Sequence, residues 1–375
     1  MQPLRGTCTQ VSLSALKANI QAARAFLPPR VRLMVVAKAD GYGHGLEEVG
    51  SAAQHAGADF LGVALAEEGI TLRQSGVTLP ILCFGALNQA GFDASAEWGL
   101  TATVAYAAGA RMAESAARKA VKALNVHVKL ETGMNRVGIA GKEELRAVLR
   151  AIEASPYLQL EGAYTHFADA DTPRSAYTHL QGQRFLALTN LLPKGLMLHA
   201  GASGGALFYP EYHFDMVRMG IALYGYPPQN SPVEFQPCLE LTAEVTFVKE
   251  IKAGESVGYG CTFMANRPMR VATLGIGYGD GYPRALSNRG RVLIHGVSCP
   301  VIGRVCMDQC MADVSALEGV VPGDEAVMIG RRGTGSIGAD ELADLCCTIP
   351  YEILLLPGRR VPRYYSQDKE TENAE

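Results

Sequence analysis

Eight short apolar runs alternate with longer, helix-like segments along the chain up to Gly225. The runs are rich in β-branched or apolar residues and are bounded by Gly, Pro or polar residues, as strands are. Strands that alternate with helices are typical of parallel βα units, and eight of them favour a closed (β/α)8 TIM barrel over an open sheet. The predicted strands are Val31–Lys38, Phe60–Leu65, Ile81–Gly85, Thr101–Ala105, Val126–Glu131, Leu160–Phe167, Gly195–Ala200 and Met216–Tyr224.

The clearest helix-like segments of this region are Ser14–Phe26, Ala107–Leu124, Lys142–Ala154 and Thr172–Leu192. The last of them has Thr172-Pro173 at its start, which predicts a cap followed by a proline in the first turn.

After Tyr226-Pro227-Pro228 the pattern changes to strands separated by turns, and only Ala339–Cys346 has a helical pattern. We therefore expect two domains, an α/β barrel over 1–228 and a mostly β domain over 229–375, with the first ~10 residues able to pair with the β domain. The polar tail Ser366–Glu375 is expected to fray. The predicted strands of the β domain are Leu239–Ile251, Arg270–Gly277, Arg291–His295, Ser298–Ile302, Met311–Val314 and Glu325–Gly330.

Composition narrows the functional classes. Apolar residues make up 48% and charged residues 19%, which excludes a disordered chain. A net charge of −3 argues against nucleic acid as a partner, and no apolar run is long enough to predict a membrane helix. The nine cysteines are scattered without paired zinc-ligand spacing, so we expect no metal site and a reducing, cytoplasmic setting.

Reactive side chains fall at the ends of the predicted strands, where barrel enzymes carry their chemistry. Lys38 ends the first strand, Lys129 lies late in the fifth, and His166 lies near the end of the sixth. Ser203 follows the seventh strand, whereas Arg218 lies early in the eighth as its bounds are predicted.

Lys38 closes a buried apolar strand and precedes a glycine-rich turn. Burial lowers the pKa of a lysine, and the neutral amine can form a Schiff base. The same residues are compatible with a strand-end lysine that extends to solvent. The letters K-A-D-G also fit the K-x-D-G nucleophile of nucleotidyl-transferring ligases, although that class predicts a basic nucleic-acid surface. The segment alone leaves these three interpretations open.

Several blocks in both predicted domains resemble those of alanine racemases, the fold-type III pyridoxal-phosphate enzymes. The cofactor-lysine block is V-V-A-K-A-D-G-Y-G-H-G at 35–45. The others are H-V-K-L-E-T-G-M-N-R-V-G at 127–138, T-H-F-A-D-A-D at 165–171, R-M-G-I-A-L-Y-G at 218–225, V-G-Y-G at 257–260, G-Y-G-D-G-Y-P-R at 277–284, G-R-V-C-M-D-Q at 303–309 and P-Y-E at 350–352.

This resemblance implies a (β/α)8 barrel followed by a β domain, and a head-to-tail homodimer with shared active sites. It implies interconversion of L-alanine and D-alanine with pyridoxal 5′-phosphate, which supplies D-alanine for peptidoglycan. The alternatives are a related racemase acting on serine or other amino acids, a decarboxylase of the same fold, and a non-catalytic pyridoxal-phosphate protein.

By the same resemblance, Lys38 holds the cofactor and serves the D-alanine face, and Tyr259 of the partner subunit serves the L-alanine face. The family pattern implies that His199 and Arg218 lie behind this tyrosine and that Arg218 faces the pyridine nitrogen. His166 would pack beside the pyridine ring. An arginine donates a hydrogen bond without protonating that nitrogen, which would suppress transamination.

The remaining implied roles concern the phosphate, the substrate and the access route. Arg136 would contact the phenolic oxygen of the cofactor and the substrate carboxylate, oriented by a carbamylated Lys129. Met307 and Asp308 of the partner subunit would help to bind that carboxylate and shape the entry. Ala202 stands where the family commonly has Asn, which could alter rate or substrate range. The phosphate would be bound by Ser203, Gly220, Ile221, Tyr42 and Tyr351, and the access corridor would include Tyr278, Asp280 and Arg284.

Overall fold

The computed structural model describes residues 5–366, which form two compact units. One unit comprises Leu16–Gly41 and Gly45–Gln236, and the other comprises the described residues up to Ala15, Tyr42–His44 and the described residues from Pro237 onward. The expected fraying of Ser366–Glu375 concerns residues that, apart from Ser366, lie outside the described part.

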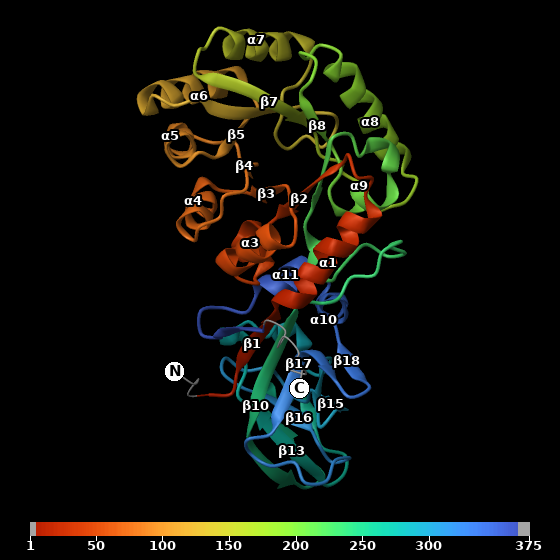
Figure 1. The fold of residues 1–375 in the computed structure, drawn as a ribbon. Helices are drawn as coiled ribbons and strands as arrows, with labels where there is room; N and C mark the ends of the chain where they lie inside the picture. The colour runs from red at the N-terminus through yellow and green to blue at the C-terminus, as the bar shows by residue number, and fades with distance from the viewer. Residues whose placement is uncertain (1–4, 367–375) are drawn as a thin grey trace, which may run out of the picture. The chain divides into compact units, whose positions relative to one another are not determined.

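Eight parallel strands of the first unit close into a barrel in chain order, and β2 pairs with β9 to complete it (Figure 1). The predicted (β/α)8 barrel is therefore confirmed. The strands are β2 (Arg32–Val36), β3 (Phe60–Val63), β4 (Ile81–Cys83), β5 (Thr101–Val104), β6 (Leu124–Lys129), β7 (Leu158–Tyr164), β8 (Met197–His199) and β9 (Met216–Met219).

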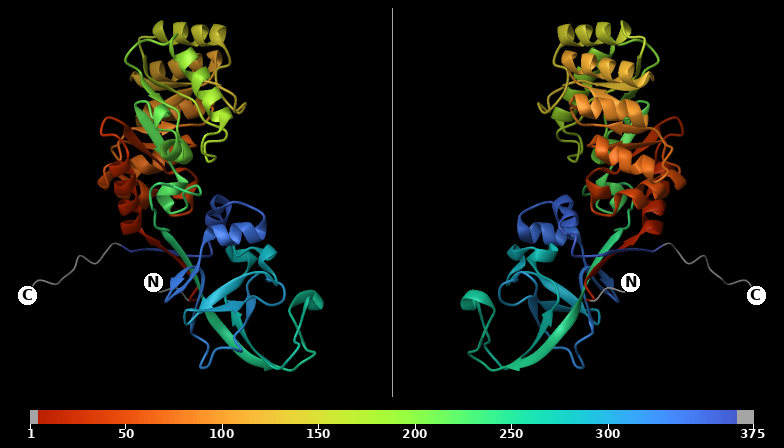
Figure 2. Two further views of the ribbon diagram at one scale, coloured as in Figure 1. Left: turned by 90° about the vertical axis from the view of Figure 1, so that its right-hand side faces the viewer. Right: turned by 90° about the vertical axis from the view of Figure 1, so that its left-hand side faces the viewer.

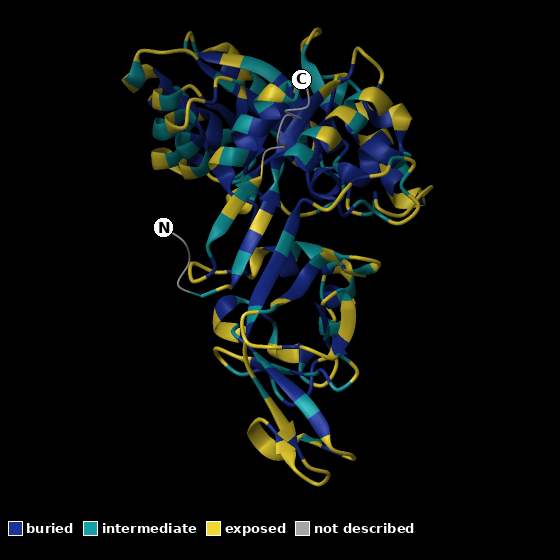
Figure 3. Ribbon diagram, turned by 60° about the horizontal axis from the view of Figure 1, so that its bottom comes forward, coloured by how far each residue is buried: buried dark blue, intermediate teal, exposed yellow. Residues whose placement is uncertain are grey.

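The barrel helices are amphipathic and cover the strands with their apolar faces. In α7 the buried residues Leu145, Val148 and Ile152 recur at helical spacing, and exposed and buried positions alternate along the helices in Figure 3. The helices are α1 (Leu13–Phe26), α3 (Leu46–His55), α4 (Ala66–Gln74), α5 (Gln89–Trp98), α6 (Ala107–Ala120), α7 (Lys142–Glu153), α8 (Ala176–Thr189) and α9 (Ser203–Phe208).

Several predicted bounds in the barrel differ from the observed ones by a few residues, and three of the differences have clear local reasons. Helix α6 ends at Ala120 instead of Leu124, because Val121 takes a left-handed φ of 52°. Helix α8 is capped by Ser175, whose side chain accepts from the N–H of Thr178, and not by Thr172-Pro173. The eighth strand ends at Met219, because Ile221–Tyr224 forms the 3-10 helix η2. Arg218 therefore lies near the carboxyl end of its strand.

The second unit is built on a nine-stranded sheet in which β10 (Leu239–Ile251) is the longest strand (Figure 2). Neighbouring strands of the sheet are antiparallel, except for the parallel pair of β1 and β19. The other strands of the sheet are β1 (Cys8–Ser12), β13 (Met269–Leu274), β14 (Arg291–Ile294), β15 (Val297–Pro300), β16 (Cys310–Asp313), β17 (Glu325–Arg332), β18 (Gly335–Ile337) and β19 (Arg363–Ser366), and β11 (Ser256–Val257) pairs with β12 (Phe263–Met264).

A mostly β second unit is thus confirmed, but within residues 237–366 it holds two α-helices where one was predicted. The predicted segment forms α10 (Ala339–Cys346), and Pro350–Leu355 forms α11, with Pro350 in its first turn where no N–H is needed. Among the described residues, no helix combines the length and the apolar character needed to cross a membrane.

Candidate active site

The carboxyl ends of the barrel strands bring the sequence-predicted barrel residues to one rim. Lys38 lies two residues after β2, Lys129 ends β6, and His166 lies two residues after β7. His199 ends β8, and Arg218 is the third residue of β9. In a closed parallel barrel these ends share one face. Burial lowers the pKa of His166 most, and the positive charges of Arg218, Arg136, Lys129 and Lys38 lower it further, as expected where these side chains share one rim.

Lys38 is half-buried, and its pKa is lowered by burial and then by the positive charge of Arg136, while Glu68 opposes the shift. A lowered pKa increases the neutral fraction of the amine, which is the form that attacks a carbonyl or accepts a proton. The structure therefore supports the reactive interpretation of this lysine over the solvated one.

The backbone after Lys38 makes a left-handed turn. Ala39 has φ 52° and ψ 58°, Asp40 has φ 55° and ψ 45°, and Tyr42 has φ 54°. Only glycine adopts this region freely, and each other residue costs roughly 1–2 kcal/mol there. The N–H of Leu46 donates to Oδ1 of Asp40 across 3.0 Å, which helps to hold the turn. Strained backbone of this kind concentrates at functional sites.

Glu68, which sequence reasoning missed, joins this turn to α4. Its carboxylate accepts the N–H groups of Ala39, Ala64 and Leu65 at 2.5, 2.8 and 3.1 Å. A glutamate three residues after a helix N-cap is the sequence signal of a capping interaction. That signal accounts for the hydrogen bond from the N–H of Leu65 to Glu68. It does not account for the hydrogen bond that the other carboxylate oxygen accepts from Ala39, the residue after Lys38.

Arg218 is only 3% exposed, and neutral groups surround its guanidinium. Nη1 donates to Nδ1 of His199 across 2.9 Å, and Nη2 donates to the carbonyls of Thr165 and Ala200 at 2.8 Å. Nη2 also lies 3.3 Å from Nδ1 of His166. Burial lowers the pKa of Arg218 to about 10, so the group stays protonated at neutral pH. It is a fixed, cationic hydrogen-bond donor.

Lys129 is buried, and its Nζ lies 5.6 Å from the centroid of the Tyr164 ring. Burial and the charges of Arg136 and Arg218 lower its pKa to about 8, while Glu131 opposes the shift. Asp169, which follows His166 in the loop after β7, accepts from the hydroxyls of Thr172 and Ser175.

Arg136 lies in the loop that follows β6. The N–H of Ile139 donates to the carbonyl of Lys129 across 2.8 Å, and the backbone N–H of Glu131 donates to the carbonyl of Ile139 across 3.0 Å. Gly138 has φ +149°, and a Cβ there would lie 2.8 Å from the nitrogen of Glu131. The loop therefore returns tightly to the strand, and Arg136 is presented at the rim.

Ser203, Gly220 and Ile221 follow the neighbouring strands β8 and β9. The hydroxyl oxygen of Ser203 accepts the N–H of Gly220 at 3.1 Å and that of Ala222 at 3.5 Å. Ala202 precedes α9 as its N-cap without a side-chain hydrogen bond. The hydroxyl and the backbone N–H groups gathered here are donors of the kind that bind phosphate in barrels.

The predicted residues of the second unit lie on its surface or near it, except for Tyr42 and Asp280, which are buried. Tyr259 is 72% exposed, and the glycines on both sides of it have φ +74°. Met307 and Tyr278 are also exposed, as is Arg284. The ring centroids of Tyr42 and Tyr351 lie 5.8 Å apart, which places the two phenols side by side in this unit.

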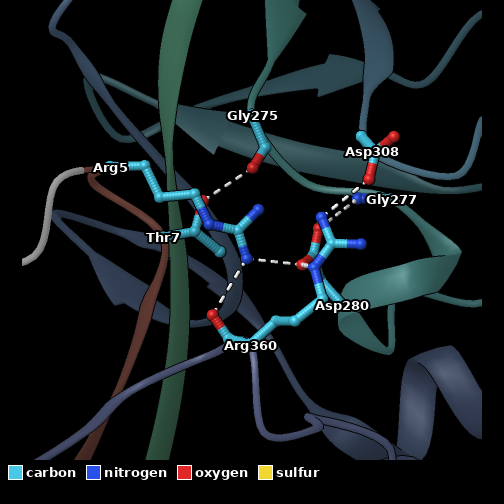
Figure 4. A network of polar contacts seen from close by, with 7 residues as sticks. All are labelled: Arg5, Thr7, Gly275, Gly277, Asp280, Asp308 and Arg360. Carbon is cyan, nitrogen blue, oxygen red and sulfur yellow. Dashed lines mark hydrogen bonds and ion pairs between the residues drawn. The ribbon is translucent and has the colours of Figure 1, made fainter.

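Asp280 is fully buried between two arginines (Figure 4). Its Oδ1 lies 2.5 Å from Nη2 of Arg5 and 3.2 Å from Nε of Arg360, and its Oδ2 accepts the N–H of Gly277. Arg360 also donates to Asp308 across 2.7 Å. The charge of Asp308 is thus paired.

Three further side chains belong to the barrel interior and were missed by sequence reasoning: His127, Glu161 and Tyr164. The Tyr164 ring stacks on His199 with centroids 4.8 Å apart and planes at 8°. His127 could have been found because it lies two residues before Lys129 on the same strand and shares its face. Glu161 is the charged residue of β7, whose other residues are uncharged.

Comparison with known proteins identifies relatives along nearly the whole chain. Residues 11–228 match the family described as alanine racemase, N-terminal domain, and residues 238–365 match alanine racemase, C-terminal domain. The alanine racemase of Symbiobacterium thermophilum is 43% identical over 369 residues, covering 96% of this chain and 97% of its own length.

Solved structures of amino-acid racemases are similar to this chain over nearly its whole length. The crystal structure of alanine racemase from E. faecalis superposes with a TM-score of 0.92 at 34% identity, covering 96% of this chain and 98% of that one. A histidine racemase from Leuconostoc mesenteroides has a TM-score of 0.90 at 31% identity, covering 97% of this chain and 99% of that one.

Proposed function

We propose a two-base racemisation for this chain, which belongs to the alanine racemase family and interconverts L-alanine and D-alanine. The observation that carries the proposal is Lys38, a half-buried lysine with a lowered pKa at the carboxyl end of a barrel strand and within the field of Arg136.

The residues at the barrel rim fit pyridoxal 5′-phosphate. Lys38 offers a reactive amine, Arg218 a buried cationic donor, and Ser203 with the N–H groups after β9 a set of phosphate donors. Tyr42 and Tyr351 would add hydroxyl donors for the phosphate. When bound, this cofactor withdraws electrons from Cα of the amino acid, so that the Cα proton can be removed.

Lys38 acts on one face of the substrate. Its neutral amine accepts the Cα proton of D-alanine at Nζ and returns a proton to the same face in the reverse direction. Burial and Arg136 favour the neutral amine, which makes it an effective base near neutral pH.

Tyr259 acts on the opposite face, with its phenol oxygen accepting the Cα proton of L-alanine. Its exposure in this chain supports a role in a shared site, because large exposed side chains mark surfaces that a partner covers. The proposed assembly is a homodimer in which Tyr259 of one subunit serves the barrel of the other.

Arg218 and His166 control the cofactor ring from the protein side. Arg218 keeps its proton and, with the cofactor bound, would donate a hydrogen bond to the pyridine nitrogen, while His166, 3.3 Å from Nη2 of Arg218, would lie beside the ring. This limits transamination, since the nitrogen is not fully protonated. The substrate carboxylate would be bound by Arg136 of one subunit together with Met307 and Asp308 of the other, and Arg360 neutralises Asp308 within its own subunit.

Two measurements test the proposal. The holoenzyme should absorb visible light, and borohydride should remove that absorbance and leave the cofactor attached to Lys38. Lys38→Ala should lose both the attachment and racemisation. A protein that stays colourless after reconstitution would contradict the cofactor assignment.

The second measurement is deuterium incorporation at Cα, started from each alanine enantiomer and then from serine and histidine. Histidine belongs in this series because a structural neighbour is a histidine racemase. We expect the highest kcat/KM with alanine from either enantiomer. A higher value with serine or histidine would reassign the substrate while keeping the two-base chemistry.

A further inference from the structure

A chain of four side chains crosses the barrel interior behind Arg218. Nη1 of Arg218 lies 2.9 Å from Nδ1 of His199, and Nε2 of His199 lies 2.8 Å from Nδ1 of His127. Nε2 of His127 lies 3.2 Å from Oε2 of Glu161. The two histidines are fully buried and connect the buried arginine directly to Glu161, whose side chain is 26% exposed.

The groups at the two ends of this series of side chains fix the direction of its hydrogen bonds. A guanidinium can only donate, so Nδ1 of His199 accepts, and in the neutral ring the proton lies on Nε2. That Nε2–H donates to Nδ1 of His127, whose own proton therefore lies on Nε2. The Nε2–H of His127 donates to Glu161, which as a carboxylate only accepts. Each hydrogen bond thus points from the arginine toward the glutamate.

The backbone of β7 is shaped for this arrangement. Val126 pairs with Leu160, but the next residue, His127, pairs with Gly162, so Glu161 is the extra residue of a β-bulge. Bulges redirect a side chain out of the regular alternation. Gly162 makes room for the imidazole, because a Cβ there would lie 2.7 Å from Cε1 and 2.9 Å from Nδ1 of His127.

The four linked side chains connect the positive charge of Arg218 to a negative charge. The groups that accept hydrogen bonds from Arg218 are two imidazoles and two carbonyls, all neutral. A buried cation without compensating charge is costly. Glu161 is the carboxylate to which the hydrogen-bonded imidazoles connect it, and polarised hydrogen bonds pass its charge along.

We propose that Glu161 is a positioning residue for racemisation, which through His127 and His199 holds the Arg218 guanidinium oriented and charge-compensated at the pyridine nitrogen. The chemical part of this inference rests on the proposed function, whereas the hydrogen-bond chain itself does not.

The first test reads the chain directly. In protein without cofactor, ¹⁵N side-chain shifts should show His127 and His199 as neutral rings protonated on Nε2, with the signals assigned by His127→Asn and His199→Asn. Glu161→Leu removes the final acceptor and should shift the ¹⁵N signals of both rings. Thr101→Val is the matched control, because it removes only the 3.3 Å hydrogen bond from Thr101 to the same Oε2. It should leave both tautomers unchanged.

The second test uses the holoenzyme. Glu161→Leu should bind cofactor but lower kcat by roughly tenfold or more, the usual size for residues that orient a catalytic group. Its rate of half-transamination with alanine should rise relative to racemisation. Glu161→Gln keeps an acceptor for His127 without the charge, so it should recover part of the lost kcat. In an Arg218→Leu background, Glu161→Leu should add no further change.

The outcomes separate the two proposals. A wild-type protein that neither binds the cofactor nor racemises alanine contradicts the proposed function, and the ¹⁵N shifts still report on the chain. Wild-type racemisation together with unchanged tautomers, kcat and half-transamination in Glu161→Leu overturns the role of Glu161. Equal losses of kcat in the wild-type and Arg218→Leu backgrounds would also overturn it, because Glu161 would then act independently of Arg218.

Discussion

The backbone N–H of Ala39, the residue after Lys38, donates to Oε1 of Glu68 across 2.5 Å. This bond does two things at once. It stabilises a left-handed turn that Ala39 and Asp40 enter at a cost, and it brings a negative charge near the Lys38 amine, whose pKa that charge raises. Glu68 therefore opposes the shift that burial and Arg136 produce.

Glu68→Gln should lower the pKa of Lys38 further, because it removes the charge that opposes the shift. In protein without cofactor, the rate at which an amine-reactive reagent labels Lys38 should rise at a lower pH than in the wild type. Glutamine has one accepting oxygen where Glu68 uses two, so about 1–3 kcal/mol of unfolding free energy should also be lost, measured with urea. Glu67→Gln, an exposed neighbour, should change neither quantity, and an unshifted labelling curve in Glu68→Gln would contradict the argument.

The barrel and the residues on its rim could largely be predicted from the sequence, and the exceptions have physical reasons. Lys38, His166 and Ser203 follow strand-like runs, so the rule for parallel barrels predicts their common face. Glu161 could not be predicted, because a β-bulge breaks the alternation on which inward-facing positions are counted. The contact between Glu68 and Ala39 joins two segments that become neighbours only when β2 and β3 pair.

In the second unit, too, long regular elements could be predicted from the sequence, whereas short elements and distant contacts could not. The long strand Leu239–Ile251 was predicted with its observed bounds, because it alternates over many residues. Helix α11 was missed because Pro350–Leu355 is short and its apolar residues also fit a strand. The pairing of Asp280 with Arg5 and Arg360 joins distant parts of the chain, and no local pattern carries that information.

Lys129 should accept carbon dioxide more readily than an ordinary lysine. With its pKa at about 8, about one-tenth of the amine is neutral at pH 7 and half at pH 8, whereas an unperturbed lysine is about 0.1% neutral or less at pH 7. The neutral amine forms the N–C bond and loses a proton. With ¹³C-bicarbonate, a carbamate signal should therefore appear and should grow from pH 6 to pH 8. Lys129→Gln should lack the signal, and its absence from the wild type over this range would exclude the modification.

Tyr259→Phe should separate the two directions of the reaction. Without the phenol oxygen, removal of the Cα proton from L-alanine should fall by about 10²–10⁴-fold, the range for loss of a general base. Exchange of the Cα proton of D-alanine with solvent should persist, because Lys38 serves that face. The measurement is deuterium incorporation from each enantiomer. Tyr364→Phe makes the same chemical change at another exposed tyrosine of this unit and should leave both rates intact. Equal rates from both enantiomers in Tyr259→Phe would remove Tyr259 from the two-base assignment.

Asp280→Asn should destabilise the second unit strongly, because it leaves two arginines beside a buried group that no longer carries a charge. Only the carboxylate is buried, since the side chains of Arg5 and Arg360 are 35% and 48% exposed, so solvent screens their charges and the cost should be about 1–3 kcal/mol. Asparagine can still accept the N–H of Gly277, so the loss reports on the charge rather than on that hydrogen bond.

Asp308→Asn is the matched comparison for Asp280→Asn, because it removes the other carboxylate that contacts Arg360, at an exposed pair. Exposed pairs contribute about 1 kcal/mol or less, so urea unfolding should distinguish the two variants clearly. Raised ionic strength should weaken only the exposed pair, since salt screens buried charges much less. If both variants lose the same small amount of stability, Asp280 is not the anchor that its burial and its two arginine partners indicate.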